Sequence, residues 1–105
     1  MKKSSGLGGC VISNNILTGK GDLRWCIKEE PVNDVDTGWR FLSDNDTEEF
    51  LSDSSNMSVC DWNTIFEIEP AVMKIYDMPI HTEVTLLKEN NRRFFVYTDS
   101  EEEVF

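Results

Sequence analysis

Apolar and polar positions alternate along several short segments of this chain, a pattern that predicts β-strands. In residues 23–28, every second position is Leu, Trp or Ile, with Arg, Cys and Lys between them. A period of two is typical of a strand with one buried face. Trp39 and Phe41 repeat this spacing after a break at Gly38. We therefore expect a second strand here, paired with the first and joined to it by residues 29–37.

Further segments have strand character. Residues 9–13 form a short β-prone run after a Gly- and Ser-rich start, and residues 57–60 form another. Residues 84–88 and 93–98 predict a closing hairpin around the Asn-Asn pair at 90–91, because asparagine tolerates the positive φ of tight turns. The chain thus offers five or more short strands for one sheet.

The first helical signal is a capping pattern. Asp46 is followed three residues later by Glu49, and this spacing fits an N-cap with its supporting carboxylate. The pattern predicts a short helix over residues 47–53. Phe50 and Leu51 are expected to face the core.

A second helical signal follows. Residues 64–67, Thr-Ile-Phe-Glu, offer another capping pattern. Apolar side chains then recur at spacings of three and four, as on one helix face. Pro70 interrupts this face, so we expect a helix that ends near Glu69 and a further turn that starts at Pro70. The apolar residues of this face are Ile65, Ile68, Val72 and Tyr76.

These elements predict a small single α+β domain with a mostly antiparallel sheet and two or three short helices. The 105 residues fit one domain. We place it at residues 9–98, after a flexible N-terminus at 1–8 and before an acidic, frayed tail at 99–105. No run approaches the roughly 20 apolar residues of a membrane span, and the start lacks the apolar stretch of a secretory signal. We expect a soluble, cytoplasmic protein.

Catalytic and metal-binding patterns are scarce. Cys10, Cys26 and Cys60 show no Cys-x-x-Cys spacing, and we expect them to be reduced thiols within apolar surroundings. A zinc site would need these three and the single histidine, His81, to converge from four distant segments. Residues 44–46 begin like a calcium loop but lack its glycine and final glutamate. We expect no metal, no cofactor and no enzymatic activity, although a pairing of His81 with a cysteine stays open.

Charge is concentrated in the middle of the chain. The net charge is −10, and residues 29–61 carry ten acids against Arg40 alone. Such a field repels nucleic acids and anionic membranes, and it accelerates encounter with a basic partner. The simpler alternative is that these acids only keep a small protein soluble. We expect neither a nucleic acid nor a membrane as partner.

Six ordered motifs resemble those of the immunity protein 33 family, over about residues 9–87. The resemblance implies a single α+β domain that acts as the antidote to a bacterial toxin encoded beside it. Such an antidote needs no catalytic group, because blocking the active site of the toxin suffices. The motifs are Cys10-Val-Ile-Ser13, Gly19-Lys-Gly-Asp-Leu-Arg-Trp25, Glu29-Glu-Pro-Val-Asn33, Asp36-Thr-Gly-Trp-Arg-Phe-Leu-Ser-Asp44, Trp62-Asn-Thr-Ile-Phe-Glu-Ile-Glu-Pro70 and Tyr76-Asp-Met-Pro79.

Charge and resemblance together predict an acidic surface that binds a basic toxin by imitating phosphate. Its expected residues are Asp34, Asp36, Asp44, Asp46, Glu48, Glu49 and Asp53. Other motif residues are expected to be structural, namely Trp39, Arg40, Trp62, Asn63, Glu69 and Pro70. Two alternatives stay open. One is a general cytosolic interaction or regulatory module, and the other is a small ligand-binding domain or enzyme with a pocket near Trp39, Arg40 and Glu69. The sequence predicts no oligomeric state.

Overall fold

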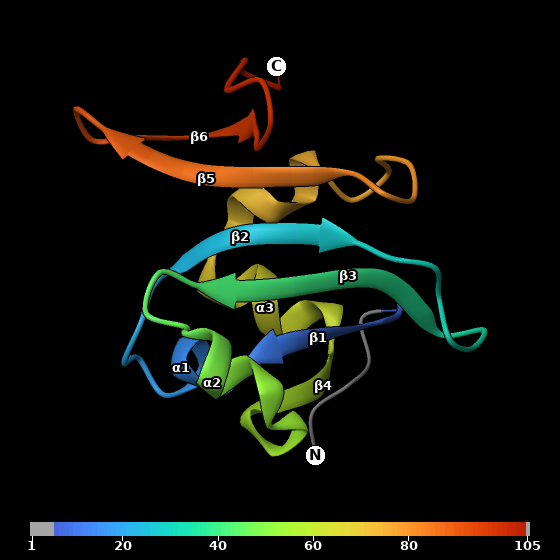
Figure 1. The fold of residues 1–105 in the computed structure, drawn as a ribbon. Helices are drawn as coiled ribbons and strands as arrows, with labels where there is room; N and C mark the ends of the chain where they lie inside the picture. Colours follow the sequence, from blue (N-terminus) through green and yellow to red (C-terminus); the bar gives the residue numbers. More distant parts are fainter. Residues whose placement is uncertain (1–5, 105) are drawn as a thin grey trace.

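A six-stranded mixed sheet forms the centre of the computed structural model, which describes residues 6–104 (Figure 1). The strand order is β4-β1-β3-β2-β5-β6. Four of the five pairings are antiparallel, and only β1 and β3 run parallel. The strands are β1 (Gly9–Ser13), β2 (Leu23–Lys28), β3 (Asp36–Ser43), β4 (Met57–Asp61), β5 (Glu83–Glu89) and β6 (Arg92–Tyr97).

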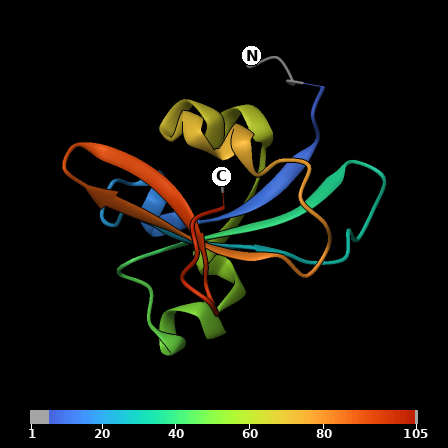
Figure 2. The same ribbon diagram turned by 90° about the horizontal axis from the view of Figure 1, so that it is seen from above.

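Short helices flank the sheet on both sides. Figure 2 shows α3 and the 3₁₀-helix η2 on one side, and α2 with the 3₁₀-helix η1 on the other. The α+β fold class is therefore confirmed. The helices are α1 (Asn14–Leu17), α2 (Glu48–Ser52), η1 (Ser54–Asn56), α3 (Trp62–Ile68) and η2 (Pro70–Lys74). None in the described range is long and apolar enough to cross a lipid bilayer.

The core lies between the sheet and the layer formed by α3 and η2. Trp39 stacks on Phe41 at a ring-centroid distance of 6.1 Å, and Phe41 contacts Trp62 at 5.7 Å. Tyr76 meets Trp62 edge to face at 4.8 Å. The two tryptophans and Phe41 are fully buried. Offset and edge-to-face contacts of this kind stabilise a core beyond the area that they bury.

The predicted strand pair is confirmed. Strands β2 and β3 are antiparallel, with Cys26 opposite Phe41. Strand β3 begins at Asp36, so the joining loop is shorter than expected and comprises residues 29–35. The predicted first strand at 9–13 is also confirmed. It pairs in parallel with β3, a partner that no local pattern indicated.

The two remaining strand predictions hold as well. Strand β4 follows the expected segment and continues to Asp61. Strands β5 and β6 form the expected hairpin, and Asn90 and Asn91 adopt φ angles of 50° and 66° at its tip. Two consecutive positive φ angles match the twist of a two-residue hairpin turn.

Both predicted helix caps are wrong by a few residues. Thr47, not Asp46, caps α2 by accepting a hydrogen bond from the Phe50 N–H at 3.1 Å. Asp61, not Thr64, caps α3 by accepting one from the Asn63 N–H at 2.8 Å. Each true cap immediately precedes its helix, where a side-chain oxygen reaches the unpaired N–H groups of the first turn.

Side-chain burial in the helices also differs from expectation. Ile65 and Val72 are fully buried, but Ile68 is 43% exposed because α3 ends there and the chain changes direction before η2. Phe50 and Leu51 of α2 are only half-buried. The predicted end of the helix and the new turn at Pro70 are confirmed.

The C-terminal residues differ most from the sequence-based expectation. Residues 99–104 were expected to fray, yet Val104 packs against the core and its N–H donates to the Phe95 carbonyl oxygen at 2.9 Å. At the other end, residues 1–5 of the expected flexible segment lie outside the described residues. The Gly8 carbonyl oxygen accepts a hydrogen bond from the Trp62 N–H at 2.8 Å. The domain boundaries at 8 and 98 stay predictions.

Candidate protein-binding surface

The seven acids of the predicted surface lie at two opposite ends of β3. Asp36 is the first residue of this strand, and Asp44 follows its last residue, Ser43. Seven residue steps of about 3.3 Å put roughly 23 Å between the two ends. The structure therefore does not gather the seven residues into one patch. Asp34 and Asp36 lie at one end, and the other five lie at the end where α2 begins.

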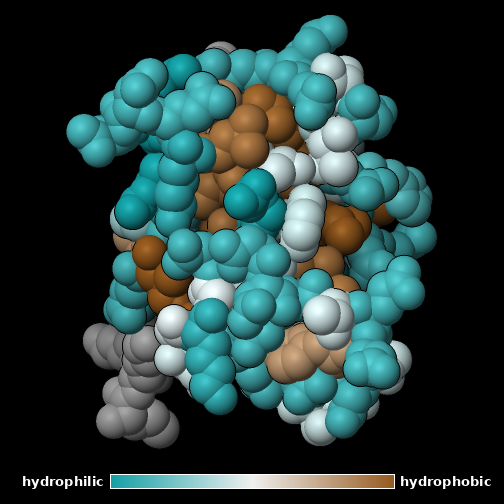
Figure 3. All heavy atoms as spheres, turned by 60° about the vertical axis from the view of Figure 1, so that its left-hand side comes forward, coloured by the Kyte–Doolittle hydropathy of each residue, from teal (hydrophilic) through white to brown (hydrophobic). Residues whose placement is uncertain are grey.

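Four exposed carboxylates cluster around α2, and we call them the α2 acidic surface. They are Asp44, Glu48, Glu49 and Asp53. None forms an ion pair with another described residue. Hydrogen bonds from Ser55 lower the pKa of Asp53, which caps η1. Figure 3, in which the side of the molecule that bears α1 and α2 comes forward, shows hydrophilic residues over most of this face.

Asp46 lies beside these four residues but turns inward. Its carboxylate accepts hydrogen bonds from the Ser43 hydroxyl at 2.6 Å and the Ser43 N–H at 2.8 Å. The Ser13 hydroxyl and the Asn15 side-chain amide also donate to it, each at 2.9 Å. Burial raises the pKa of Asp46, but these hydrogen bonds outweigh it, and the net pKa is lowered. Asp46 thus ties the ends of β1 and β3 together and positions the start of α2.

Asp36 is likewise held within the protein, at the opposite end of β3. Its carboxylate accepts two hydrogen bonds from the Arg40 guanidinium, at 2.9 and 2.8 Å, and its side chain is only 8% exposed. The N–H groups of Val32 and Gly38 also donate to it. The Arg40 hydrogen bonds hold the pKa of Asp36 well below its usual range. Glu29 completes the cluster through the Arg40 Nε at 3.1 Å. This cluster anchors the 29–35 loop to the sheet.

A cleft of about 620 Å³, here called the β4 cleft, lies between the 29–35 loop, the segment before β1, and strand β4. Asp34, Asp36 and Asp61 line it, together with Val35 and Val59. The two valines are 69% and 84% exposed. Sequence reasoning missed both valines. Val59 lies in a short strand segment whose sequence does not indicate which face of the strand is buried.

The family motif at residues 36–44 is explained by packing around Gly38 and Trp39. Gly38 has a φ of 89°, and a Cβ at this position would lie 2.2 Å from the Glu29 carbonyl oxygen. Only glycine fits such a conformation at such a close approach. The buried Trp39 indole N–H donates to the Tyr76 carbonyl oxygen at 3.1 Å, which ties β3 to the segment after η2. The Lys28 ammonium lies 5.7 Å from the Trp39 ring centroid.

The family motif at residues 62–70 builds α3 and its junction with η2. Trp62 is fully buried, and its indole N–H lies 3.0 Å from the Met73 sulfur. Asn63 donates to the Glu67 carboxylate one turn later, at 3.1 Å. Both side chains therefore make their contacts within the α3–η2 region, Trp62 in the core and Asn63 at a half-buried position.

Glu69 and Pro70 form the junction itself. Glu69 is only 6% exposed, and its carboxylate accepts a hydrogen bond from the Ala71 N–H at 3.3 Å while it pairs with Arg93 at 3.1 Å. Pro70 occupies the start of η2, where a missing N–H costs nothing. The ion pair connects this junction to β6.

Nucleophilic and metal-binding chemistry finds little support in the described residues. Burial raises the pKa of Cys10 to about 12 and raises that of Cys26 further. Because the thiolate is the reactive form, these thiols are poor nucleophiles. His81 lies in the turn before β5, where its N–H donates to the Lys28 carbonyl oxygen at 2.6 Å. No group of three His, Cys, Asp or Glu side chains within residues 6–104 is placed to hold a metal ion.

Comparison with known proteins identifies the family. No curated protein sequence and no solved structure matches this chain. A family model described as the immunity protein Imm33 domain matches residues 10–97. This range contains all six motifs that carried the resemblance, and it includes β1 to β6 almost entirely. With most of its length matched, the chain belongs to the Imm33 immunity protein family.

Proposed function

We propose that this protein binds and neutralises a cognate bacterial toxin, and that the α2 acidic surface contacts that toxin. Family membership supports an immunity role in general. The observation that carries the specific proposal is the cluster of Asp44, Glu48, Glu49 and Asp53, exposed and without ion pairs to described residues. Because no described Lys or Arg compensates these carboxylates, their negative charges are available to a partner.

Neutralisation by this surface requires no chemistry from the immunity protein. A toxin that cleaves nucleic acid has a basic substrate cleft, and four carboxylates can occupy the positions of substrate phosphates. Opposite charges also steer the encounter and raise the association rate. Burial raises the pKa of the Cys10 and Cys26 thiols, so neither is an activated nucleophile.

A small ligand-binding domain is the weaker alternative. It required a pocket near Trp39, Arg40 and Glu69. Trp39 is fully buried, Arg40 is committed to Asp36, and Glu69 pairs with Arg93. None of the three residues lines the β4 cleft, and Glu69 alone of them lines a separate cleft of about 190 Å³ beside Arg93. The other alternative, an interaction module without a toxin partner, is separated from the proposed immunity role by the affinity capture described next.

The first test is affinity capture. The tagged protein retains partners from its native cells, and a salt gradient elutes them. A single basic protein released progressively as salt rises supports the proposal, because exposed ion pairs weaken with ionic strength. Its toxicity, and relief of that toxicity by this protein, are then measured in cells. Failure to retain a toxic protein contradicts the proposal.

The second test locates the contact. We compare a variant with Asp44, Glu48, Glu49 and Asp53 all changed to Lys against a control with Glu83, Glu89, Asp99 and Glu102 changed to Lys. Both sets are exposed and change the net charge equally. We expect the first variant to bind the captured toxin at least about a hundredfold more weakly and the control to lose far less, because close charge pairs dominate over distant ones. Equal losses would assign the attraction to net charge alone.

A further inference from the structure

The outer edge of β4 is unpaired among the described strands, and its backbone geometry is specific. Val59 lies opposite Val11 of β1. Three residues further along each strand, Trp62 lies opposite Gly8, and the Trp62 N–H donates to the Gly8 carbonyl oxygen. Trp62 and Gly8 are therefore a hydrogen-bonded pair. Opposed residues in an antiparallel pair alternate between bonded and non-bonded positions. Val59 is therefore in a non-bonded position toward β1, and its N–H and carbonyl oxygen point outward from the sheet.

The side chain of Val59 is exposed on the same side of the sheet as α2. Its neighbour Cys60 packs against the core, and successive side chains of a strand point to opposite faces. Val59 therefore projects away from α3, toward the side on which Figure 2 shows α2. Its 84% exposure and the 69% exposure of Val35 give the β4 cleft an apolar lining at two points.

The charge of the β4 cleft favours a basic occupant. Asp34, Asp36 and Asp61 line it, and no Lys or Arg of residues 6–104 does. Asp36 is paired with Arg40, but Asp34 is exposed. A second copy of this chain would bring a net charge of −10 and the same carboxylates to the edge, so self-pairing here is opposed by repulsion.

We propose that the outer edge of β4 binds an extended, basic segment of the toxin as an added strand. One residue of this segment exchanges both backbone hydrogen bonds with Val59, an apolar side chain covers Val59, and a basic side chain reaches Asp34. Strand addition supplies affinity through the backbone and specificity through alternate side chains. The identity of the partner rests on the proposed function.

The location of β4 fits this proposal. The chain runs from α2 through η1 directly into β4, and Figure 1 shows these segments together along the lower part of the molecule. Asp53 caps η1, four residues before Met57 begins the strand. A partner that contacts the α2 acidic surface can therefore extend a segment along β4.

The first experiment uses a peptide probe with the full-length protein. The probe is acetyl-Lys-Val-Lys-Val-Lys-Val-Lys-amide, and its control is the same peptide methylated at every backbone nitrogen. Charge and side chains are equal, but the backbone of the control cannot donate hydrogen bonds. We expect at least tenfold slower exchange of the Val59 amide proton on binding, and at least tenfold weaker binding of the control. Equal binding of both peptides overturns the proposal, as does an unchanged Val59 exchange rate.

Variants of Val59 provide the second experiment. Val59→Pro removes the outward N–H without removing a hydrogen bond to β1, and Val59→Thr retains both shape and N–H. We expect at least tenfold weaker peptide binding for the proline variant and a change below twofold for threonine. Thermal melting of each variant checks the fold. If the proline variant unfolds, the methylated peptide still decides the question.

The captured toxin separates this inference from the proposed function. If Val59→Pro binds the toxin as tightly as the unchanged protein does, the edge is not the contact, although the immunity role stands. If the peptide binds at β4 but no toxin is captured, the proposed function fails while the strand-addition site remains. A dimer that Val59→Pro dissociates, in a protein that does not bind the peptide, assigns the edge to a second copy and overturns the proposal.

Discussion

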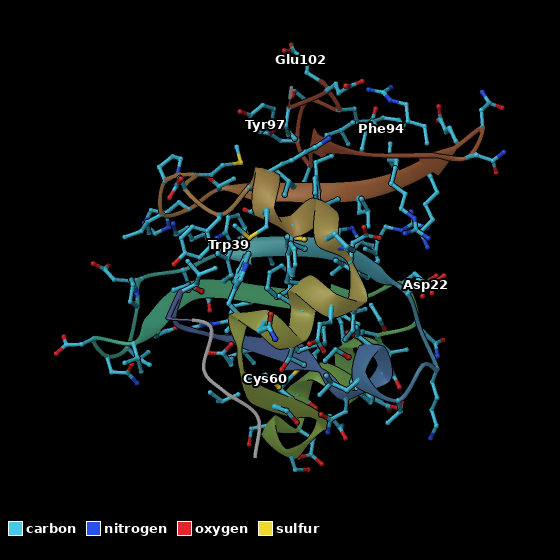
Figure 4. The ribbon with its side chains drawn as sticks, turned by 180° about the vertical axis from the view of Figure 1, so that it is seen from behind. Asp22, Trp39, Cys60, Phe94, Tyr97 and Glu102 are labelled. Carbon is cyan, nitrogen blue, oxygen red and sulfur yellow. The ribbon has the colours of Figure 1, made fainter. Side chains whose placement is uncertain are left out.

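The two outer edges of the sheet carry similar residues in opposite environments. Strand β4 forms one edge and strand β6 the other. Val59 of β4 is 84% exposed, whereas Val96 of β6 is only 5% exposed. Figure 4 shows the two edges at opposite ends of the molecule, with Cys60 near the first and Tyr97 and Glu102 near the second.

The chain itself covers the β6 edge. Val96 forms an antiparallel bridge with Glu103, and the Tyr97 N–H donates to the Glu102 carbonyl oxygen at 2.8 Å. Glu103 also pairs with Arg92. An unpaired edge is a template for another strand, and proteins cover such edges or place charges and prolines on them. Among the described strands, the covered β6 edge and the exposed Val59 make β4 the edge for which we propose strand pairing with a partner.

The largest loss of stability is expected for a core substitution, which tests whether the β4 and β6 edges unfold together as one cooperative unit. Trp62→Ala removes a fully buried indole next to β4, and we expect it to lower the free energy of unfolding by about 3–5 kcal/mol. Urea denaturation measures this loss, and amide exchange reports each edge separately. Trp25→Ala is the control, because Trp25 is 36% exposed and should cost less than half as much. Faster exchange confined to β4 would show that the edges unfold independently.

A smaller effect is expected at the loop beside β4. Asp36→Asn breaks the paired hydrogen bonds with Arg40 and should lower the free energy of unfolding by about 2–3 kcal/mol at pH 7. Folding lowers the pKa of Asp36. The ion pair therefore contributes fully above its unfolded value of about 4 and loses its contribution as the pH falls toward the lower folded value.

Denaturation at several pH values checks that the contribution of the Asp36–Arg40 ion pair to stability falls as the pH falls. The unchanged protein should lose stability below about pH 4 more steeply than Asp36→Asn does. Asp34→Asn is the matched control, because Asp34 is exposed in the same loop. Parallel pH curves for Asp36→Asn and the unchanged protein would contradict the role given to this ion pair.

The two edge valines provide a direct test of the comparison. Val96→Ala should cost about 2 kcal/mol, because it removes buried methyl groups, while Val59→Ala should stay within about 0.5 kcal/mol of the unchanged protein. Thermal or urea unfolding of both variants measures the difference. Similar costs at the two positions would remove the distinction between a closed and an open edge.

A smaller loss of stability than that of Val96→Ala is expected from opening the β6 edge. Deletion of residues 99–105 removes three backbone hydrogen bonds and the packing of Val104, offset by the entropy of ordering that segment, for a net loss of about 1 kcal/mol. Sedimentation should then show new self-association through β6. The control for charge is the full-length chain with Asp99 changed to Asn and with Glu101, Glu102 and Glu103 changed to Gln, because the deletion removes these four acids. A deleted protein that stays as monomeric as the control would show that the segment does not protect this edge.

Local patterns predicted much of the fold. The period-two segments at 23–28 and 39–41 paired as expected, and the Asn-Asn turn formed the hairpin. Helix caps were misplaced because Asp46 and Thr64 carry the same hydrogen-bonding groups as the true caps, Thr47 and Asp61. Which oxygen reaches the first turn depends on the path of the preceding strand.

The candidate surface was less predictable. The acids were visible in the sequence, but their spacing does not reveal that β3 separates Asp36 from Asp44. Nor does it reveal that Asp46 accepts hydrogen bonds from Ser13, thirty-three residues away. Val59 could not be identified either, since alternation shows that one side of a strand is buried but not which strand lies at an edge.

By itself, the sequence determined the strand-forming segments, the break at Pro70, the hairpin turn and the family, because these depend on residues close together in the chain or on ordered motifs. Only the tertiary structure decided that β1 lies between β3 and β4, that Val104 returns to β6, and that Val59 stays exposed. The reason is physical. Strand order and edge protection come from contacts between distant segments, whose energies depend on how the whole chain packs and not on any local pattern.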